Sequence, residues 1–313
     1  MTEAISRVGV VGLGAMGAGI AQSLVRAGLE VHVCDVRPDA VQKLVDAGAH
    51  AAASPAALAP RVDALIIVVV NALQTEQVLF GAAGEGGNGV EGAVAHLKPG
   101  SVVIASATVA PEFAEALGAR LLAMGLRFID APISGGAAKA ALGQMSVMAA
   151  GAPETFAACS RIFEAICSKL YRLGDQPGQG SKVKMINQLL AGVHIAAAAE
   201  AMALGLRAGC DPDALYEVIS NSAGSSWMFQ NRVPHILAGD YTPLSSVNIF
   251  VKDLGIVLDY AKKSVFPLPL SATAHQMFMQ ASAAGYGLED DSAVVKMFPG
   301  ITLPAAKTGN SAK

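Results

Sequence analysis

The first half of the chain alternates short apolar runs with helical patterns. The run "ALIIVVV" (64–70) is continuous and β-branched, which is typical of a strand buried on both faces. Helical patterns over 17–27 and 38–47 separate the first three runs. Strands that alternate with helices predict a mainly parallel sheet with helices on both faces. The other predicted strands are "RVGVVG" (7–12), "EVHVCD" (30–35), "SVVIAS" (101–106), "RFIDAP" (127–132), "MSVMAAG" (145–151) and "KLYRLG" (169–174).

Strand patterns end near residue 180, and only helical patterns follow. We therefore predict the α/β class: a Rossmann-type doubly wound sheet over 1–178 and an all-helical domain over 179–304. A flexible tail is expected over 305–313, and the glycine-rich stretch 81–92 is expected to be a mobile loop. The predicted helices of the second domain are 180–208, 212–221, 246–264 and 268–284.

The helix predicted over 180–208 is apolar on most faces and is about 40 Å long at 1.5 Å per residue. Its most apolar part, 189–206, is as long as a membrane span, but it contains His194 and Glu200. An acidic residue at mid-membrane costs on the order of 3 kcal/mol. We therefore predict a buried helix that joins the two domains and that a partner subunit covers, in a homodimer or homotetramer.

Composition supports a globular enzyme. Hydrophobic residues make up 53% of the 313 residues and charged residues 15%, so a large core is expected. The net charge of −3 gives no basic footprint for nucleic acid. The four cysteines form no CxxC pair, no cluster has metal-ligand spacing, and the N-terminus shows no signal peptide. These features favour the cytoplasm and predict no metal, nucleic-acid or membrane partner.

The first predicted strand leads into "GLGAMG", a G-x-G-x-x-G pattern at Gly12, Gly14 and Gly17. In this position Gly12 permits a tight turn, Gly14 lets a pyrophosphate approach the backbone, and Gly17 lets the helix pack on the strand. Asp35 ends the second strand, where a carboxylate accepts hydrogen bonds from ribose hydroxyls and repels a 2′-phosphate. The pattern predicts NAD as the cofactor, although Arg37 partly counters the repulsion.

Two further stretches carry candidate chemistry. In "DAPISGG" (130–136), Ser134 offers a hydroxyl while Gly135 and Gly136 expose amide protons, a combination that suits a carboxylate but also suits a simple tight turn. In "GQGSKVKMINQ" (178–188), two lysines fall in the first turns of a helix, where the exposed amides disfavour cations. A lysine placed there calls for a functional explanation.

These stretches together resemble the β-hydroxyacid dehydrogenase family, which includes 3-hydroxyisobutyrate dehydrogenase and tartronate semialdehyde reductase. "GLGAMG", "DAPISGG", "GQGSKVKMINQ" and "FVKDLG" occur in the family's order and spacing, and the resemblance spans about residues 6 to 300. Longer stretches, such as "GYGLEDDSAVVKMFPGITLP", resemble the L-threonate dehydrogenase branch. That resemblance implies NAD-dependent oxidation of a four-carbon sugar acid at its C2 hydroxyl.

The resemblance assigns a catalytic role to Lys184, with Asn187 and Gln188 on the same helical face as substrate-binding residues. The family commonly has Asn-Asn at these two positions, so the longer Gln188 bears on substrate identity. Family members also often have Ser and Asp where Ala107 and Ala105 stand here. The remaining implied residues are Ser134, Gly135 and Gly136 for the substrate carboxylate and Gly12, Leu13, Gly14, Ala15, Met16, Gly17, Asp35, Thr108 and Lys252 for the cofactor.

In this interpretation Lys184 is a general base. Burial and the helix N-terminus are both expected to lower its pKa, so that it takes the proton of the substrate hydroxyl as hydride leaves the same carbon. Lys182, two positions away, is expected to be a surface charge. Two alternatives remain: the same chemistry on 3-hydroxyisobutyrate or a tartronate semialdehyde-type acid, and a non-catalytic scaffold that keeps the cofactor fold.

Overall fold

The computed structural model describes residues 4–82 and 90–305. The chain divides into two compact units, Met1–Met185 and Ile186–Lys313. The helix α9 (Gln179–Arg207) runs from the first unit into the second.

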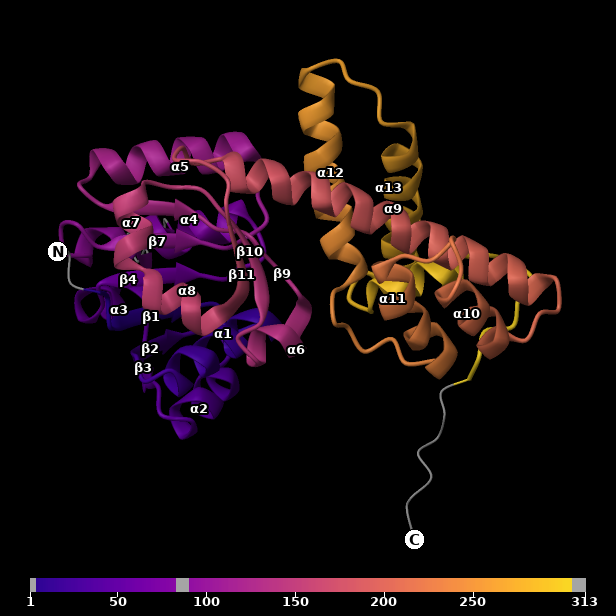
Figure 1. Ribbon diagram of the computed structural model, residues 1–313, viewed down its shortest axis with the longest axis horizontal. Helices are drawn as coiled ribbons and strands as arrows, with labels where there is room; N and C mark the ends of the chain where they lie inside the picture. The colour runs from indigo at the N-terminus through magenta and orange to yellow at the C-terminus, as the bar shows by residue number, and fades with distance from the viewer. Residues whose placement is uncertain (1–3, 83–89, 306–313) are drawn as a thin grey trace, which may run out of the picture. The chain divides into compact units, whose positions relative to one another are not determined.

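The first unit is built on a six-stranded sheet with the strand order β3-β2-β1-β4-β7-β8, and every neighbouring pair is parallel (Figure 1). Crossing from β1 to β4 reverses the direction in which the strands are added, which creates the switch point where doubly wound folds bind dinucleotides. The strands are β1 (Arg7–Val11), β2 (Glu30–Cys34), β3 (His50–Ala51), β4 (Ala64–Ile67), β7 (Val102–Ala105) and β8 (Arg127–Asp130).

Side chains that alternate along the strands form a core on each face of this sheet. On one face, Val10 and Ile66 join Ile20 of α1 in a single buried cluster. On the other, Leu65 and Ile67 join the α5 residues Leu117 and Leu121. The helices of this unit are α1 (Ala15–Arg26), α2 (Pro38–Asp46), α3 (Pro55–Leu58), α4 (Ala72–Phe80), α5 (Pro111–Ala123), α6 (Gly136–Ala141), α7 (Pro153–Ala158) and α8 (Ser160–Ile166), with 3₁₀ turns η1 (Ala59–Arg61) and η3 (Val94–His96).

A second sheet of three strands, β11-β10-β9, completes the first unit. Its central strand β10 (Met145–Ala149) pairs in parallel with β11 (Cys167–Arg172) and antiparallel with β9 (Ile133–Ser134). The short strands β5 (Gly81–Ala82) and β6 (Val90–Glu91) pair with each other. The ends of the stretch expected to be a mobile loop over 81–92 are therefore paired strands, which corrects that expectation for these residues. Residues 83–89 lie outside the described residues, as do 306–313 of the expected tail.

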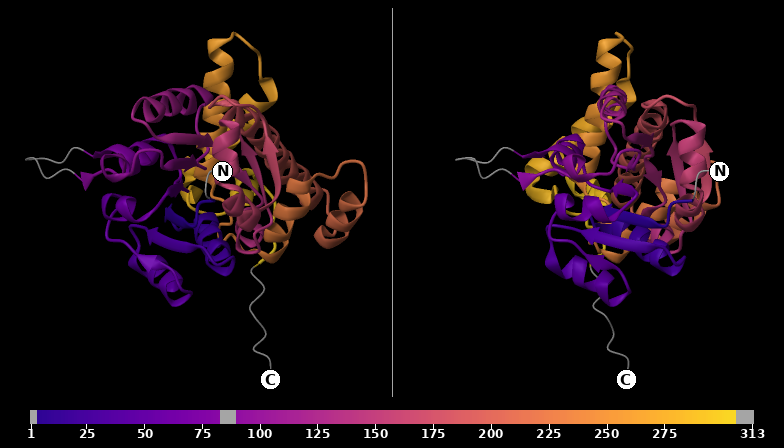
Figure 2. Two further views of the ribbon diagram at one scale, coloured as in Figure 1. Left: turned by 60° about the vertical axis from the view of Figure 1, so that its left-hand side comes forward. Right: turned by 90° about the vertical axis from the view of Figure 1, so that its left-hand side faces the viewer.

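Every described helix or strand element of the second unit is helical, as predicted. Its core joins α9 with the helices that follow, and Phe250 stacks on Phe278 with ring centroids 5.2 Å apart. Helices α12 and α13 lie side by side (Figures 1 and 2). The elements after α9 are α10 (Pro212–Ser220), α11 (Trp227–Ala238), α12 (Val247–Lys263), α13 (Pro269–Ala281), the π-helical turn η4 (Ser282–Tyr286) and the 3₁₀ segment η5 (Asp291–Met297).

The predicted fold class is confirmed: a Rossmann-type doubly wound sheet is followed by a helical region that the long helix α9 begins. By length and composition α9 is also the one helix in the described residues that is apolar enough to cross a membrane. Core helices of soluble proteins have the same composition, and Ile195 and Met202 of α9 are buried in the core of the second unit.

Candidate active site

The glycine loop between β1 and α1 has the close packing that its sequence pattern predicts. Gly12 has a φ of +92°, and a Cβ there would lie 2.5 Å from the carbonyl oxygen of Val68. A Cβ on Gly17 would lie 1.8 Å from the carbonyl oxygen of Gly12. By contrast, apart from Gly14 and its two chain neighbours, no atom of the described residues lies within 4 Å of a Cβ built on Gly14. The protein itself therefore requires glycine at the first and third positions but leaves space above the second, as a loop that receives a pyrophosphate does.

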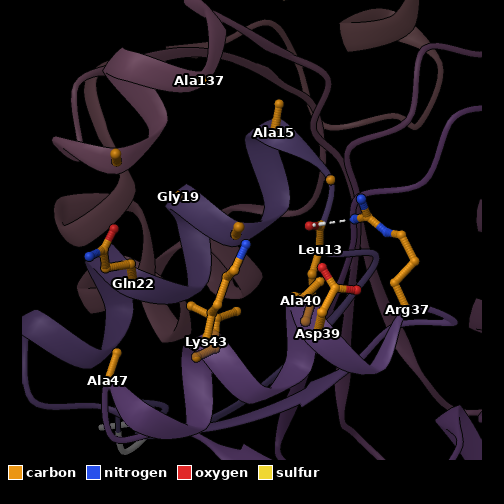
Figure 3. A pocket seen from close by; sticks show the side chains of 14 residues that line it. Leu13, Ala15, Gly19, Gln22, Arg37, Asp39, Ala40, Lys43, Ala47 and Ala137 are labelled. Carbon is orange, nitrogen blue, oxygen red and sulfur yellow. Dashed lines mark hydrogen bonds between the residues drawn. The ribbon is translucent and has the colours of Figure 1, made fainter.

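Asp35 is fixed at the end of β2 beside this loop. Its Oδ2 accepts a hydrogen bond of 2.5 Å from the amide of Leu13, and its Oδ1 accepts bonds from the amide and Nε of Arg37. Arg37 also donates from Nη2 to the carbonyl oxygen of Leu13 (Figure 3). Burial opposes ionisation, but these hydrogen bonds and the Arg37 charge hold the pKa of Asp35 below its ordinary value. The ionised carboxylate of Asp35 is therefore favoured where ribose hydroxyls are expected.

A groove of about 430 Å³ continues from the glycine loop between α1, α2 and α6 (Figure 3). Its walls are mostly small apolar side chains, and Gln22 and Lys43 extend along it. Leu13, Gly14 and Ala15 line its end, but none of the predicted substrate residues does. The groove is therefore a neighbour of the cofactor loop and not the place where the substrate residues meet.

The "DAPISGG" stretch forms a turn in which two consecutive glycines have positive φ, +137° at Gly135 and +76° at Gly136. Ser134 precedes them on β9, and helix α6 begins at Gly136. Other residues adopt this backbone only with strain. The turn leaves Gly136 exposed and Ser134 half-buried, so a hydroxyl and amide protons are available to an anion.

The loops that follow β4 and β7 lie at the same edge of the sheet as the glycine loop, because neighbouring parallel strands end on one side. Val68 continues β4 by donating its amide to the carbonyl oxygen of Val11, and Ser106 does the same with Ile67. Thr108 follows two residues later and is half-buried. This edge therefore carries the glycine loop, Asp35 and Thr108, the cofactor residues that the sequence predicts in this unit.

Lys184 is buried near the start of α9, with 6% of its surface exposed. The preceding turn is held by Asp130 at the end of β8: Oδ2 accepts hydrogen bonds from the amides of Gly178 and Ser181, and Oδ1 accepts one from Ser181 Oγ. Burial raises the pKa of Asp130 even though these bonds favour its ionised form. Lys182, in contrast, is half-exposed and forms a 2.8 Å ion pair with Glu115.

In the second unit, the two amides that follow Lys184 belong to a buried polar chain. Asn187 donates to Gln188 Oε1 at 3.0 Å, and Gln188 Nε2 donates to Asp253 Oδ2 at 2.6 Å. The other oxygen of Asp253 accepts from Lys252 Nζ at 2.5 Å. Because a carboxylate only accepts, Asp253 fixes the orientation of both amides. Gln188 is 8% exposed, so its extra length over asparagine is directed into this network.

Two residues of these networks were not assigned roles from sequence: Asp130 and Asp253. Asp130 and Asp253 stand inside the motifs "DAPISGG" and "FVKDLG". Their partners are 48 to 65 positions away, and helical or strand periodicity carries no signal for such pairs. A buried acidic residue within a motif was the available sign, since such residues are rarely buried unless paired.

A doubly wound sheet with a glycine loop that receives a dinucleotide, an acid at the end of β2 and a buried lysine on a separate helix together define a nicotinamide-dependent dehydrogenase. The comparisons with known proteins agree. Residues 7–174 match the model of the NAD-binding domain of 6-phosphogluconate dehydrogenase. Residues 178–298 match the NAD-binding domain of NADP-dependent 3-hydroxyisobutyrate dehydrogenase.

Relatives that match over nearly the full chain specify the type of dehydrogenase more narrowly. The chain is 65% identical over 297 residues to L-threonate dehydrogenase of Cupriavidus necator, covering 95% of this chain and 97% of that one. It is 53% identical to L-threonate dehydrogenase of Escherichia coli K12, covering 96% and 97%. A crystal structure of 3-hydroxyisobutyrate dehydrogenase from Salmonella typhimurium superposes with a TM-score of 0.88 at 53% identity, covering 93% and 99%. The chain belongs to the β-hydroxyacid dehydrogenase family of the 3-hydroxyisobutyrate dehydrogenase type, and its cofactor is NAD, as predicted.

Proposed function

We propose that the protein oxidises L-threonate at C2 to the 2-oxo acid, with Lys184 as the general base. The proposed substrate is supported by the 65% identity over nearly the full length to a relative of that activity. The observation that carries the proposed mechanism is the burial of Lys184, because an ammonium kept out of water near a helix N-terminus is disfavoured and the neutral amine is the proton acceptor the reaction needs.

The roles of the other residues follow from their chemistry. Ser134 Oγ and the amides of Gly135 and Gly136 bind the substrate carboxylate, which determines the carbon that faces the cofactor. Neutral Lys184 Nζ takes the proton of the C2 hydroxyl as hydride leaves the same carbon, and the ammonium that forms stabilises the negative charge developing on that oxygen. NAD, when bound, supplies the hydride acceptor. Asn187 and Gln188 contact the remaining hydroxyls, and Thr108 and Lys252 contact the cofactor.

The same proposal includes a preference for NAD over NADP. Asp35 is held ionised at the end of β2 and accepts from ribose hydroxyls, and its charge repels a 2′-phosphate. The backbone of Gly12–Gly17, with Leu13, Ala15 and Met16, holds the pyrophosphate. Arg37 offsets part of this repulsion, but its Nε and Nη2 already donate to Asp35 and Leu13, so these two donors are not available to a 2′-phosphate.

A second candidate substrate is 3-hydroxyisobutyrate, which the 53% identity to a crystal structure of that name favours. The two acids make different demands on the pocket. Threonate requires hydroxyl partners, whereas 3-hydroxyisobutyrate requires space for a methyl group. The polar chain from Asn187 to Asp253 favours threonate, because amide side chains near Lys184 in sequence suit hydroxyl groups better than a methyl group.

NADH formation tests both proposals. Purified protein is mixed with NAD and L-threonate, with D-threonate, 3-hydroxyisobutyrate and D-glycerate in parallel. We expect turnover of L-threonate that Lys184→Ala lowers by at least about 1,000-fold, a loss within the range expected for a general base that also stabilises charge. Lys182→Ala is the matched control and retains activity, because that lysine is half-exposed in an ion pair. Unchanged activity in Lys184→Ala would exclude the proposed base.

We also propose a cytoplasmic homodimer or homotetramer. Ile186, Leu190 and Leu204 on α9 are each more than half exposed, and such apolar side chains are typical of surfaces that a second subunit covers. Size-exclusion chromatography with light scattering gives the mass directly, and a mass of about one chain at micromolar concentration would contradict this assembly.

A further inference from the structure

The start of α9 carries the proposed base but has no acidic residue of its own. Its first turn contains Lys182 and no carboxylate, and Lys184 follows two residues later. Exposed amide protons and nearby cations repel one another, so a helix that starts in this way needs a compensating negative charge. The carboxylate of Asp130 provides that charge from another element, the end of β8.

Asp130 is buried at the start of α9, and both of its carboxylate oxygens accept hydrogen bonds there. Asp130 is 1% exposed, and its two oxygens accept hydrogen bonds of 3.0, 2.8 and 2.7 Å from Gly178 N, Ser181 N and Ser181 Oγ. Gly180 lies between these donors, where a Cβ would be 2.4 Å from the carbonyl oxygen of Met148 and 2.8 Å from that of Asp130. The first turn of α9 therefore rests directly on the backbone of β8 and β10.

The backbone of Asp130 is itself held rigidly. Its amide donates to the carbonyl oxygen of Ala150 at 3.0 Å, and its carbonyl oxygen accepts from the Ala150 amide at 2.9 Å. Four residues later, Ser134 pairs with Ser146 on the same strand β10 that Gly180 packs against. One short segment, 130–136, thus carries both the carboxylate that holds α9 and the turn proposed to bind the substrate carboxylate.

We propose that Asp130 is a positioning residue for the reaction: it fixes the start of α9, and with it Lys184, in register with the turn of Ser134, Gly135 and Gly136. The inference rests on the proposed function for its catalytic consequence. A general base must lie within hydrogen-bond reach of the proton it takes, and a misplacement of about 1 Å costs up to about 100-fold in rate. Asp130 acts through Lys184 and does not touch the reacting atoms.

Two variants at the contact test this role. Asp130→Asn keeps the shape and lets the amide oxygen accept from Gly178 and Ser181, but it withdraws the charge. Ser181→Ala removes only the bond from Ser181 Oγ. The matched control is Asp211→Asn: Asp211 caps α10 through the amide of Ala214 at 2.8 Å, so the substitution withdraws a charge from the start of a different helix while the cap hydrogen bond can still form.

We expect Asp130→Asn to lower kcat about tenfold while the KM for NAD changes less than twofold, and Ser181→Ala to lower kcat by a smaller factor. Asp211→Asn is expected to leave kcat unchanged and to alter thermal stability only slightly, because asparagine caps a helix about as well as aspartate. If Asp130→Asn lowers only the stability and retains wild-type kcat, the positioning role is wrong and Asp130 is solely a structural cap.

A second readout needs no turnover. Competitive acetylation with trace acetic anhydride, read by mass spectrometry, reports how accessible and how basic Lys184 is. We expect the Lys184 labelling rate to rise several-fold in Asp130→Asn and to stay unchanged in Asp211→Asn. If Asp130→Asn raises the labelling rate of Lys184 but the wild-type protein oxidises none of the tested acids, the positioning role is supported and the proposed function is refuted. Wild-type labelling and kcat in Asp130→Asn overturn the positioning role alone.

Discussion

Gly14→Ala is the substitution that best distinguishes an effect on the stability of the fold from an effect on cofactor binding. Gly14 has φ −63° and ψ −171°, which residues with side chains also adopt. Apart from Gly14 and its two chain neighbours, no atom in the described part of the chain lies within 4 Å of its Cβ position. Without cofactor, the variant is therefore expected to be as stable as the wild type or more stable, since alanine restricts the unfolded chain by about 0.4–1 kcal/mol.

With cofactor the expectation is the opposite. The added methyl group occupies the space through which the pyrophosphate approaches the amides of the loop. Loss of one hydrogen bond to a charged group costs about 1.5–3 kcal/mol, which is about 10- to 150-fold in affinity. NAD at about 100 times its Kd stabilises the wild type by about 2.7 kcal/mol, and a 100-fold weaker complex retains only about 0.4 kcal/mol.

Thermal unfolding with and without NAD measures both effects. For large domains 1 kcal/mol corresponds to about 2–4 °C, so the NAD-dependent rise in Tm is expected to fall from about 5–10 °C to about 1 °C. Gly224→Ala, whose Cβ would meet its nearest neighbour at 3.9 Å, is the control. Gly17→Ala should instead lower the Tm of the free protein, because its Cβ would lie 1.8 Å from Gly12 O. An undiminished NAD effect in Gly14→Ala would refute this account of the loop.

Three further predictions follow from the structure. Asp35→Ser removes the charge that faces the ribose and is expected to raise the ratio of kcat/KM for NADP to that for NAD at least about tenfold; an unchanged ratio would show that Asp35 does not discriminate. Asp253→Asn places an amide where Gln188 Nε2 and Lys252 Nζ both donate to a carboxylate, so the KM for the acid should rise several-fold. Asp259→Asn, an exposed position on the same helix, is the control. Burial raises the pKa of Asp291 to about 6 despite its bond with Arg232. Its contribution to stability is therefore present below about pH 4 and is lost as the pH rises through about 6. Asp291→Asn should make the slope of unfolding free energy against pH, measured in urea between pH 4 and 6, more positive, and an identical slope would show that Asp291 does not titrate in this window.

The sequence determined the fold class, because the α/β alternation is a local signal. Helix α9 was predicted over 180–208 and occupies Gln179–Arg207, since a long apolar pattern between Gly178 and Gly209 has clear ends. The glycine pattern and Asp35 likewise predicted NAD, because both stand at fixed offsets from the first two strands. The mobile-loop expectation for 81–92 was wrong at its ends, where two-residue strands too short to leave a periodic signal pair with each other.

Only the tertiary structure decided how the candidate residues are held. Asp130 accepts from Ser181 across 51 positions, and Asp253 accepts from Gln188 across 65. Both carboxylates lie within hydrogen-bond distance of their donors because the fold places β8 and α12 beside them. Local sequence patterns carry no information about contacts this far apart in the chain. The sequence by itself therefore gave the chemistry that the protein has available, Lys184 among a known set of motifs. The fold decided which buried charges compensate the start of α9 and orient the amides, because burial and partner geometry exist only once the chain has folded.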